Sequence, residues 1–307
     1  MPSNISIQVS GLARHFGNKT ALSDVSFDVA KGELFGFIGP DGAGKTTLFR
    51  ILTSLLLPDA GSATVEGLDV VKDYKKLREI LGYMPGRFSL YQDLSVEENL
   101  RFFAGIFRTT PEANYDLVKD IYSQIEPFRK RKAGKLSGGM KQKLALSCAL
   151  IHKPEVLVLD EPTTGVDAVS RIEFWEMLAR LRSSGITIVV STPYMDEASR
   201  CDRVALIQNG GIMSIDTPAA IRKNFGRALW AVKADDAYRL LADLRRFKAG
   251  RSAFPFGEYI HLVPDDERLK PAEIESYLQA LGHSHISVRQ IEPSIEDCFM
   301  EMMKDSE

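Results

Sequence analysis

Long apolar runs alternate with amphipathic stretches over the first two thirds of the chain. The runs have the length of strands and are typical of a parallel sheet with both faces buried. They are residues 34–38 (LFGFI), 154–162 (PEVLVLDEP) and 185–192 (GITIVVST). Stretches with apolar residues at helical spacing lie between and beside them, at 48–56, 136–151 and 170–182. This alternation predicts an α/β fold with a mostly parallel sheet and right-handed connections.

Weaker strand patterns accompany the parallel sheet. Residues 5–9 and 24–29 alternate as strands on either side of a turn-rich connection, and residues 203–216 have the pattern of a hairpin. Residues 95–125 carry helical patterns without a strand pattern. We therefore expect an antiparallel portion beside the parallel sheet and a helical subdomain at about 95–150.

The pattern changes after Phe225. The segments that follow are strand, helix, strand, strand, helix and strand, and then one more helix. This is the split β-α-β order of a ferredoxin-like fold. We therefore predict a large α/β domain of residues 1–225 and a small C-terminal α+β accessory domain of residues 226–307.

Residues 39–47 (GPDGAGKTT) join the first apolar strand to a helix and match the pattern G-x-x-x-x-G-K-S/T. Glycines in this pattern let consecutive backbone N–H groups and the helix N-terminus point at a phosphate chain. Lys45 would reach the β- and γ-phosphates, and the Thr46 hydroxyl would ligate Mg²⁺. A plain glycine turn needs no lysine there, so we expect a phosphate-binding loop. The residues predicted to contact ATP are Gly39, Pro40, Asp41, Gly42, Ala43, Gly44, Lys45, Thr46 and Thr47.

Two acids end the second buried strand. Asp160 and Glu161 stand at its carboxyl end, the end at which open parallel sheets place function. Asp160 is expected to hold Mg²⁺ together with Thr46. Glu161 is expected to polarise the attacking water as a general base.

A second anion-binding arrangement precedes these acids. Ser137, Gly138 and Gly139 open a helix with unpaired backbone N–H groups and a hydroxyl. The alternative is a capped helix without a ligand. Phe16 lies upstream of the phosphate loop, where its ring can stack on an adenine or form part of a half-buried loop. Its position alone leaves both interpretations open.

Composition and charge narrow the function classes. The 307 residues are 44% hydrophobic and 26% charged, as in globular proteins with proper cores. The net charge of −2 gives no argument for nucleic-acid binding. Cys148, Cys201 and Cys298 lack metal-ligand spacing and fit the reduced thiols of a cytosolic protein. We expect no signal peptide, and no run approaches the ~20 apolar residues of a membrane span, so another subunit would have to cross a membrane.

With these motifs the chain resembles the ATP-binding subunit of an ATP-binding cassette (ABC) transporter, over about residues 5–216. The Walker A motif of that family is matched at 39–47. Its signature motif is matched by LSGGM at 136–140, and its Walker B motif with the catalytic glutamate by LVLDEP at 157–162. The signature is the specific element, because a phosphate loop alone also occurs in kinases and GTPases.

The resemblance implies a P-loop NTPase fold of the ABC cassette type and an ATPase that uses ATP and Mg²⁺. TTGVD at 163–167 looks like the D-loop of the family, and Phe16 matches its adenine-stacking aromatic residue. Two cassettes of that family sandwich two nucleotides head to tail, so the segment 137–139 would seal ATP held by a facing subunit. Closure would be transmitted to membrane-spanning permease subunits through a groove near residues 84–93. The chain would then be cytoplasmic and peripheral at the cytoplasmic face of a membrane, with no nucleic-acid partner.

The C-terminal part is similar to the accessory domain of the drug-exporter and ABC-2-type branch of the family. The match is the closing segment PSIED at 293–297. The resemblance implies export, but it leaves the substrate open, because membrane subunits choose it. Whether the accessory domain stabilises a dimer or regulates the cassette also stays open.

Two positions depart from the family pattern. Gly86 stands where the family has the Q-loop glutamine, and Pro193 stands where it has the switch histidine. Neither residue has a side-chain donor, and loss of one preorganised donor typically costs about 10²–10³ in rate. We therefore expect this site to bind ATP and to hydrolyse it slowly, while LSGGM completes a better site on a different cassette. This favours a heterodimer over a homodimer, although the presence of Glu161 argues for retained hydrolysis.

Two other function classes stay open at this point. The first is a nucleotide-binding regulatory ABC module with little hydrolysis, which Gly86 and Pro193 favour. The second is a soluble ABC ATPase of translation or DNA repair. Such proteins usually carry two cassettes or a long coiled-coil insert, and this sequence contains neither.

Overall fold

The computed structural model describes residues 4–266 and 268–305. Its contacts divide the chain into two compact units, one ending at Pro218 and the other beginning at Ala219. Helix α7 (Pro218–Lys223) therefore begins at the junction and belongs almost wholly to the second unit. The sequence-based boundary near Phe225 assigned this helix to the first domain. That the two units are separate domains stays a prediction.

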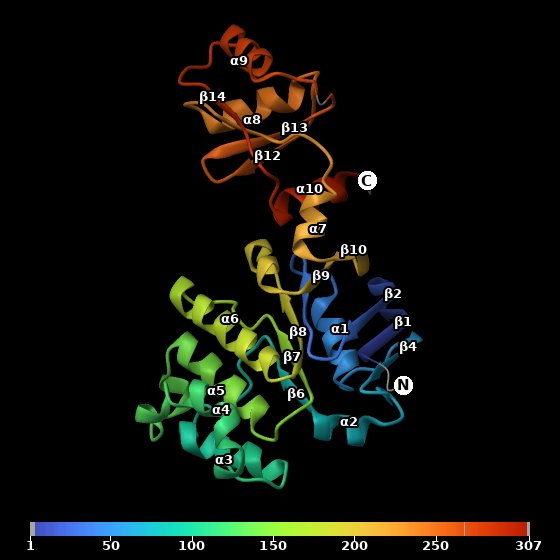
Figure 1. The fold of residues 1–307 in the computed structure, drawn as a ribbon, viewed down its shortest axis with the longest axis vertical. Helices are drawn as coiled ribbons and strands as arrows, with labels where there is room; N and C mark the ends of the chain where they lie inside the picture. The colour runs from blue at the N-terminus through green and yellow to red at the C-terminus, as the bar shows by residue number, and fades with distance from the viewer. Residues whose placement is uncertain (1–3, 267, 306–307) are drawn as a thin grey trace. The chain divides into compact units, whose positions relative to one another are not determined.

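Two β-sheets form the centre of the first unit (Figure 1). The larger sheet has the order β10-β9-β3-β8-β7-β6, in which β10 is antiparallel to β9 and the other neighbours are parallel. The smaller sheet has the antiparallel order β2-β1-β4-β5. The predicted α/β fold, with a mostly parallel sheet and an antiparallel portion, is confirmed.

The bounds of these strands follow their apolar patterns. In the larger sheet they are β3 (Leu34–Ile38), β6 (Leu81–Met84), β7 (Val156–Asp160), β8 (Thr187–Thr192), β9 (Arg203–Gln208) and β10 (Gly211–Asp216). In the smaller sheet they are β1 (Ile5–Phe16), β2 (Lys19–Ala30), β4 (Ala60–Val65) and β5 (Leu68–Asp69). Every residue of β3, β7 and β8 is buried, as expected of strands that are covered on both faces.

Strands β1 and β2 are longer than the sequence predicted. The expected turn-rich connection between residues 9 and 24 is instead a hairpin, paired from Ile5 opposite Ala30 to Phe16 opposite Lys19. Register shifts interrupt the pairing at several points, and each shift breaks the two-residue alternation that identifies a strand. Phe16 is the last residue of β1 and therefore lies at the tip of the hairpin.

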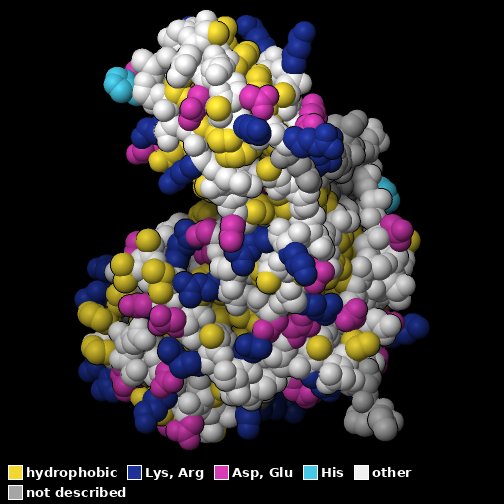
Figure 2. Space-filling model, turned by 45° about the horizontal axis from the view of Figure 1, so that its top comes forward, with side chains coloured by type: hydrophobic (Ala, Val, Ile, Leu, Met, Phe, Trp, Pro, Cys, Tyr) yellow, Lys and Arg dark blue, Asp and Glu magenta, His cyan; other side chains and the backbone are white. Residues whose placement is uncertain are grey.

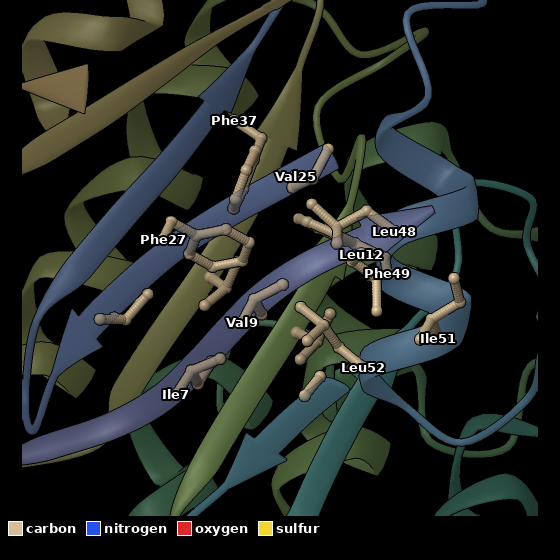
Figure 3. Packing of buried hydrophobic residues seen from close by; sticks show 14 of the residues in the cluster. Ile7, Val9, Leu12, Val25, Phe27, Phe37, Leu48, Phe49, Ile51 and Leu52 are labelled. Atoms are coloured by element: carbon tan, nitrogen blue, oxygen red, sulfur yellow. The ribbon is translucent and has the colours of Figure 1, made fainter. Parts of the chain in front are cut away.

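Helix α1 (Lys45–Leu52) is packed between the two sheets. Figure 3 shows its apolar side chains among those of β1, β2 and β3. The ring of Phe37 lies 4.9 Å from that of Phe27 and 5.7 Å from that of Phe49, measured between centroids. This aromatic contact joins the helix to both sheets, so the core fixes where α1 begins.

The other helices of this unit flank the larger sheet. Helix α6 (Ala168–Ser183) packs on β3 and β8, and α2 (Tyr74–Ile80) lies beside β5 and β6. Helices α3 (Val96–Ile106), α4 (Tyr115–Tyr122) and α5 (Gly138–Leu150) lie together, in green in Figure 1. Short 3-10 turns occur at Glu112–Asn114, Glu126–Phe128, Ala133–Lys135 and Met195–Arg200.

The second unit has a four-stranded antiparallel sheet of order β12-β13-β11-β14. With helices α8 and α9 between its strands, this order is the ferredoxin-like arrangement that the sequence predicted. The elements are β11 (Trp230–Lys233), α8 (Ala237–Arg246), β12 (Gly250–Phe256), β13 (Tyr259–Pro264), α9 (Pro271–Ala280), β14 (Ser287–Gln290) and α10 (Ile295–Asp305).

Two further features concern the charged surface of the first unit and the length of the helices. Basic and acidic side chains are mixed over the face of the first unit that Figure 2 shows, rather than separated into blocks. Among the described residues, no helix combines the length and apolar character that crossing a bilayer requires.

The cysteines yield a first prediction. All three are free and buried, and burial raises the pKa of the Cys148 and Cys201 thiols far above the usual range and that of Cys298 to about 11. Because the thiolate is the reactive form, the native thiols should stay protonated and react slowly with iodoacetamide at mildly alkaline pH. Peptide mass spectrometry should detect rapid alkylation of all three only after unfolding in guanidinium chloride. Equal rates in the native and unfolded protein would contradict the burial.

Candidate active site

The loop between β3 and α1 is a close-packed turn that requires glycine at two places. Gly44 has a φ of 108°, and a Cβ there would lie 2.5 Å from the carbonyl oxygen of Ala21. A Cβ on Gly39 would lie 2.1 Å from the carbonyl oxygen of Ile207. No larger residue fits at either position without moving backbone. The two glycines of the motif therefore let the loop lie directly against the β1–β2 hairpin and against β9.

Lys45 is buried inside this loop, with 3% of its surface exposed. Its ammonium donates to the carbonyl oxygens of Gly39, at 2.7 Å, and Pro40, at 3.0 Å. The Glu161 carboxylate lies 3.2 Å from the same nitrogen and is its counter-charge. A buried cation with a single carboxylate partner, in a loop of backbone N–H groups, is suited to an incoming phosphate.

Asp160 joins the phosphate-loop motif to β8 through hydrogen bonds to its carboxylate. One of its carboxylate oxygens, Oδ1, accepts hydrogen bonds from Thr46 Oγ1, at 3.2 Å, and Ser191 Oγ, at 2.8 Å. Asp160 and Ser191 are register partners on the parallel strands β7 and β8. A hydroxyl and a carboxylate from the protein fit Mg²⁺, which otherwise keeps water and substrate phosphates as ligands. Within residues 4–266 and 268–305, no group of three or more His, Cys, Asp or Glu side chains is arranged to hold a metal ion by itself.

Glu161 has a backbone conformation that is rare for its residue type. Its φ is 49°, in the left-handed region. The turn is held by its N–H group, which donates to the carbonyl oxygen of Ser191, at 3.1 Å, and to Ser191 Oγ, at 3.0 Å. Such strained positions cluster at functional sites, because the surrounding structure must enforce them. In this conformation the Glu161 carboxylate lies 3.2 Å from the Lys45 ammonium.

A cavity of about 190 Å³ lies over the loop and is lined by some of the predicted ATP residues, whereas Gly39, Pro40, Asp41 and Ala43 are not in its lining. It includes Phe16 from the hairpin tip and Glu161 from the end of β7. Phe16 is 46% exposed, and the Arg14 guanidinium lies 4.9 Å from its ring centroid. An exposed ring at the rim of a phosphate loop is free to stack on a base. The loop residues that line the cavity are Gly42, Gly44, Lys45, Thr46 and Thr47.

The signature segment lies elsewhere on the first unit. Ser137 caps α5 by accepting a hydrogen bond from the Met140 N–H group. Gly139 packs against α6, where a Cβ would lie 2.7 Å from Ser170 Oγ. The segment 137–139 is not part of the lining of the cavity over the loop. The structure therefore does not bring it into the cavity over the loop, although Gly138 lines the larger cavity described below, which Glu161 also lines.

Of the two departures, Gly86 lies against Asp160, and Pro193 follows the strand beside β7. A Cβ on Gly86 would lie 3.0 Å from the carbonyl oxygen of Asp160 and 3.8 Å from its Oδ2 atom. A longer side chain at this position would thus reach the Asp160 carboxylate. Pro193 follows Thr192, the last residue of β8, which is the strand beside β7.

A larger cavity of about 520 Å³ lies between the larger sheet and the helices of residues 96–150. Its lining is mainly apolar, and Gly86 and Glu161 belong to it. Burial, together with the nearby charge of Asp160, raises the pKa of Tyr83, which also lines it, to about 12. The cavity is an apolar groove that extends to Glu161, the candidate general base. Its principal apolar residues are Met84, Phe88, Leu90, Phe103, Ile106 and Phe107.

Two functional side chains escaped the sequence reasoning. Ser191 Oγ donates to the Asp160 carboxylate and accepts from the Glu161 N–H group, and Glu197 accepts hydrogen bonds from Thr163 and Thr192. A register alignment of the buried strands would have placed Ser191 opposite Asp160. Glu197 lies in a polar 3-10 turn and carries no comparable signal.

Comparison with known proteins relates the chain to ABC transporters. The family model described as ABC transporter matches residues 22–164. The chain is 38% identical to the probable multidrug ABC transporter ATP-binding protein YbhF of Escherichia coli K12, over 97% of the chain and 52% of that protein. It therefore spans about half the length of that relative. It is 32% identical to the Nod factor export ATP-binding protein I of Rhizobium sp. N33, over 98% of the chain and 97% of that protein.

A solved structure agrees with these sequence matches. An ATP-binding subunit of an ABC transporter is 28% identical and superposes with a TM-score of 0.66. The match covers 72% of this chain and 93% of that one.

The contacts of Lys45 predict the effect of removing it. Lys45→Ala should abolish the stabilisation by Mg²⁺ and ATP, because the loop loses the cation that faces the phosphates. A ligand at a hundredfold excess over its Kd stabilises the native state by about 2.7 kcal/mol, which raises Tm by several degrees. Differential scanning fluorimetry should show this shift for the wild type and for the exposed control Lys76→Ala. An undiminished shift in Lys45→Ala would contradict the assignment.

Proposed function

This chain belongs to the family of ABC transporter ATP-binding proteins, and on that premise we propose that it is the ATP-binding subunit of an exporter. It would couple ATP binding and hydrolysis to export through separate membrane-spanning subunits. The observation that carries the proposal is the convergence of Lys45, Thr46, Asp160 and Glu161. Thr46 and Asp160 are 114 positions apart in sequence and lie within hydrogen-bonding distance.

Each of these groups has a defined task. Lys45 and the loop N–H groups bind the phosphates, and Thr46 and Asp160 hold Mg²⁺, which neutralises phosphate charge when bound. Lys45 now pairs with Glu161, so a phosphate that takes over Lys45 releases the carboxylate. Glu161 is then free to accept a proton from the attacking water. Phe16 stacks on the adenine.

The second nucleotide contact comes from another cassette. Cassettes of this family dimerise and work with membrane subunits. The segment 137–139 lies outside the cavity over the chain's own loop and presents a helix N-terminus. We assign it to the ATP of the facing cassette.

The apolar groove is assigned to a membrane-spanning subunit. A short helix of such a subunit is its occupant, because apolar side chains both line the groove and continue beside it on the surface. Gly86 and Glu161 lie in the same lining, so a segment docked there is adjacent to the hydrolytic groups. The chain would thus lie at the cytoplasmic face of a membrane. Ile106 in the lining is exposed, and so are Tyr91 and Phe102, of which Phe102 packs against the lining residue Phe103.

We also propose that this site turns over slowly. A side chain at Gly86 would be within reach of Asp160, and Pro193 directly follows β8. The glutamine and histidine that these residues replace would therefore have supplied hydrogen-bond donors to the reacting phosphate and water. Glu161 keeps the general base. A slow site combined with an intact signature segment favours a heterodimer, in which the segment 137–139 completes the faster site.

A set of ATPase assays tests the slow site. The purified chain should hydrolyse ATP slowly, and Glu161→Gln should remove the remaining turnover. Gly86→Gln combined with Pro193→His should raise kcat by about 10²-fold, the typical worth of a preorganised donor. Gly86→Ala is the matched control, because it adds the same Cβ beside Asp160 without an amide.

Two results would count against this proposal. Rapid turnover of the unmodified chain, dependent on Glu161, would show that the site is not slow. If Glu161→Gln left the measured turnover unchanged, the hydrolysis would not come from this site, and a nucleotide-binding regulatory role would be favoured.

The heterodimer yields a separate prediction. The Glu161→Gln chain with Mg²⁺ and ATP should sediment as a monomer in analytical ultracentrifugation, because its slow site is built to pair with a different cassette. A stable homodimer under these conditions would contradict the proposed heterodimer. It would not contradict the proposal that the chain binds ATP.

A further inference from the structure

One buried carboxylate connects the ends of two neighbouring strands at the candidate active site. Glu197 is 3% exposed, and its Oε2 atom accepts hydrogen bonds from Thr163 Oγ1, at 3.0 Å, and Thr192 Oγ1, at 2.5 Å. Thr163 comes two residues after Glu161, and Thr192 immediately precedes Pro193. Both threonines are fully buried. A single carboxylate therefore holds together the two turns that leave β7 and β8.

A partly exposed cation, Arg171, completes this arrangement. Arg171 Nε, from α6, donates to the other oxygen of Glu197, Oε1, at 2.9 Å. The same guanidinium lies 3.2 Å from Asp196 and 4.2 Å from the centroid of the Tyr194 ring. A buried carboxylate is costly unless it is paired and hydrogen-bonded, and here both conditions are met. The turn after β8 is consequently fixed to α6 as well as to the turn after β7.

The turn after β8 is closed by its own polar groups. Thr192 Oγ1 donates to Glu197 and accepts a hydrogen bond from the Tyr194 N–H group, at 3.0 Å. Pro193 has neither an N–H group nor a polar side chain with which to reach the turn after β7. Within the described residues, Glu197 accepts hydrogen bonds from side chains of both segments, Thr163 and Thr192, and Ser191 of β8 accepts those of the Glu161 N–H group.

We propose that Glu197 is a positioning residue for ATP hydrolysis. Through its hydrogen bonds with Thr163 and Thr192 it holds the turn that contains Glu161 against the end of β8. The inference rests on the proposed ATPase function. Glu161 has a strained backbone, and its own N–H group is held from the other side by Ser191. With one end of the turn fixed by Ser191 and the other by Glu197, the carboxylate stays aimed at the loop. Loss of the Thr163 contact should let the strained turn relax, and a displacement of about 1 Å can cost 10²-fold in rate.

A second buried carboxylate in the same unit, Glu33, supplies a matched control. Glu33 is also buried and accepts three hydrogen bonds, from the Ala30 N–H group and from Arg203 Nε and Nη2. It precedes β3, at the end of the strand opposite to the phosphate loop. Glu33→Gln should therefore destabilise the fold much as Glu197→Gln does, but without disturbing the turn of Glu161.

The experiment uses the full chain and compares near-isosteric variants. Thr163→Val removes the hydroxyl with little change in volume, and Thr163→Ser keeps the hydroxyl. Single-turnover hydrolysis of radiolabelled ATP should be about tenfold slower in Thr163→Val and near wild type in Thr163→Ser. Glu197→Gln should be slowed at least as much, and combining it with Thr163→Val should add little, because the two act through one contact. Kd for Mg²⁺ and ATP should change less than about threefold in every variant, because none of the changed residues belongs to the loop.

The outcomes separate this inference from the function on which it rests. If Thr163→Val and Thr163→Ser hydrolyse ATP at the same rate, or Glu33→Gln slows it as much as Glu197→Gln, the positioning role is wrong and the ATPase function stands. If the unmodified chain shows no turnover above Glu161→Gln, the proposed hydrolysis itself fails and the positioning role fails with it. If Glu197→Gln does not fold, the two Thr163 variants still decide.

Discussion

The carboxyl ends of the parallel strands of the larger sheet all lie at one edge, and this constraint brings the candidate site residues together. Because β3 and β7 both run parallel to β8, the loop after β3, the acids at the end of β7 and Ser191 on β8 must meet there. Asp160 is the point of contact, since it accepts hydrogen bonds from both the loop and the neighbouring strand. Without that register, Lys45 would have no carboxylate beside it. The buried apolar strands are thus what makes a site from distant segments.

The two family departures have a physical meaning once this edge is known. In the proposed function, Gly86, which lies against Asp160, and Pro193, which follows β8, would remove donors without removing Lys45 or Glu161. ATP binding and hydrolysis would then depend on different parts of the edge, and the two departures would affect hydrolysis. At the same place, Glu197 supplies a structural link between the ends of β7 and β8. A site of this kind can hold ATP firmly while its chemistry depends on how well one strained turn is kept in place.

Much of this arrangement could be predicted from the sequence, because strong patterns carried it. The uninterrupted apolar runs identified the parallel strands, and the spacing of glycines, lysine and acids predicted the candidate site residues, several of which the structure brings together. The long hairpin of β1 and β2 was missed in part, since register shifts break its alternation. Ser191 and Glu197 were missed because their roles depend on which strands are neighbours, and residue type alone does not reveal strand order. The position of Gly86 against Asp160 likewise needed coordinates, whereas its difference from the family needed only the sequence.

The central claim is that the loop of residues 39–47 and the Asp160 carboxylate together take up ATP with Mg²⁺. Isothermal titration calorimetry of ATP into the folded chain, with Mg²⁺ and with a chelator, tests it most directly. The account predicts saturable binding of one ATP per chain that weakens strongly when Mg²⁺ is removed. Absence of binding to well-folded protein in the presence of Mg²⁺ would contradict it.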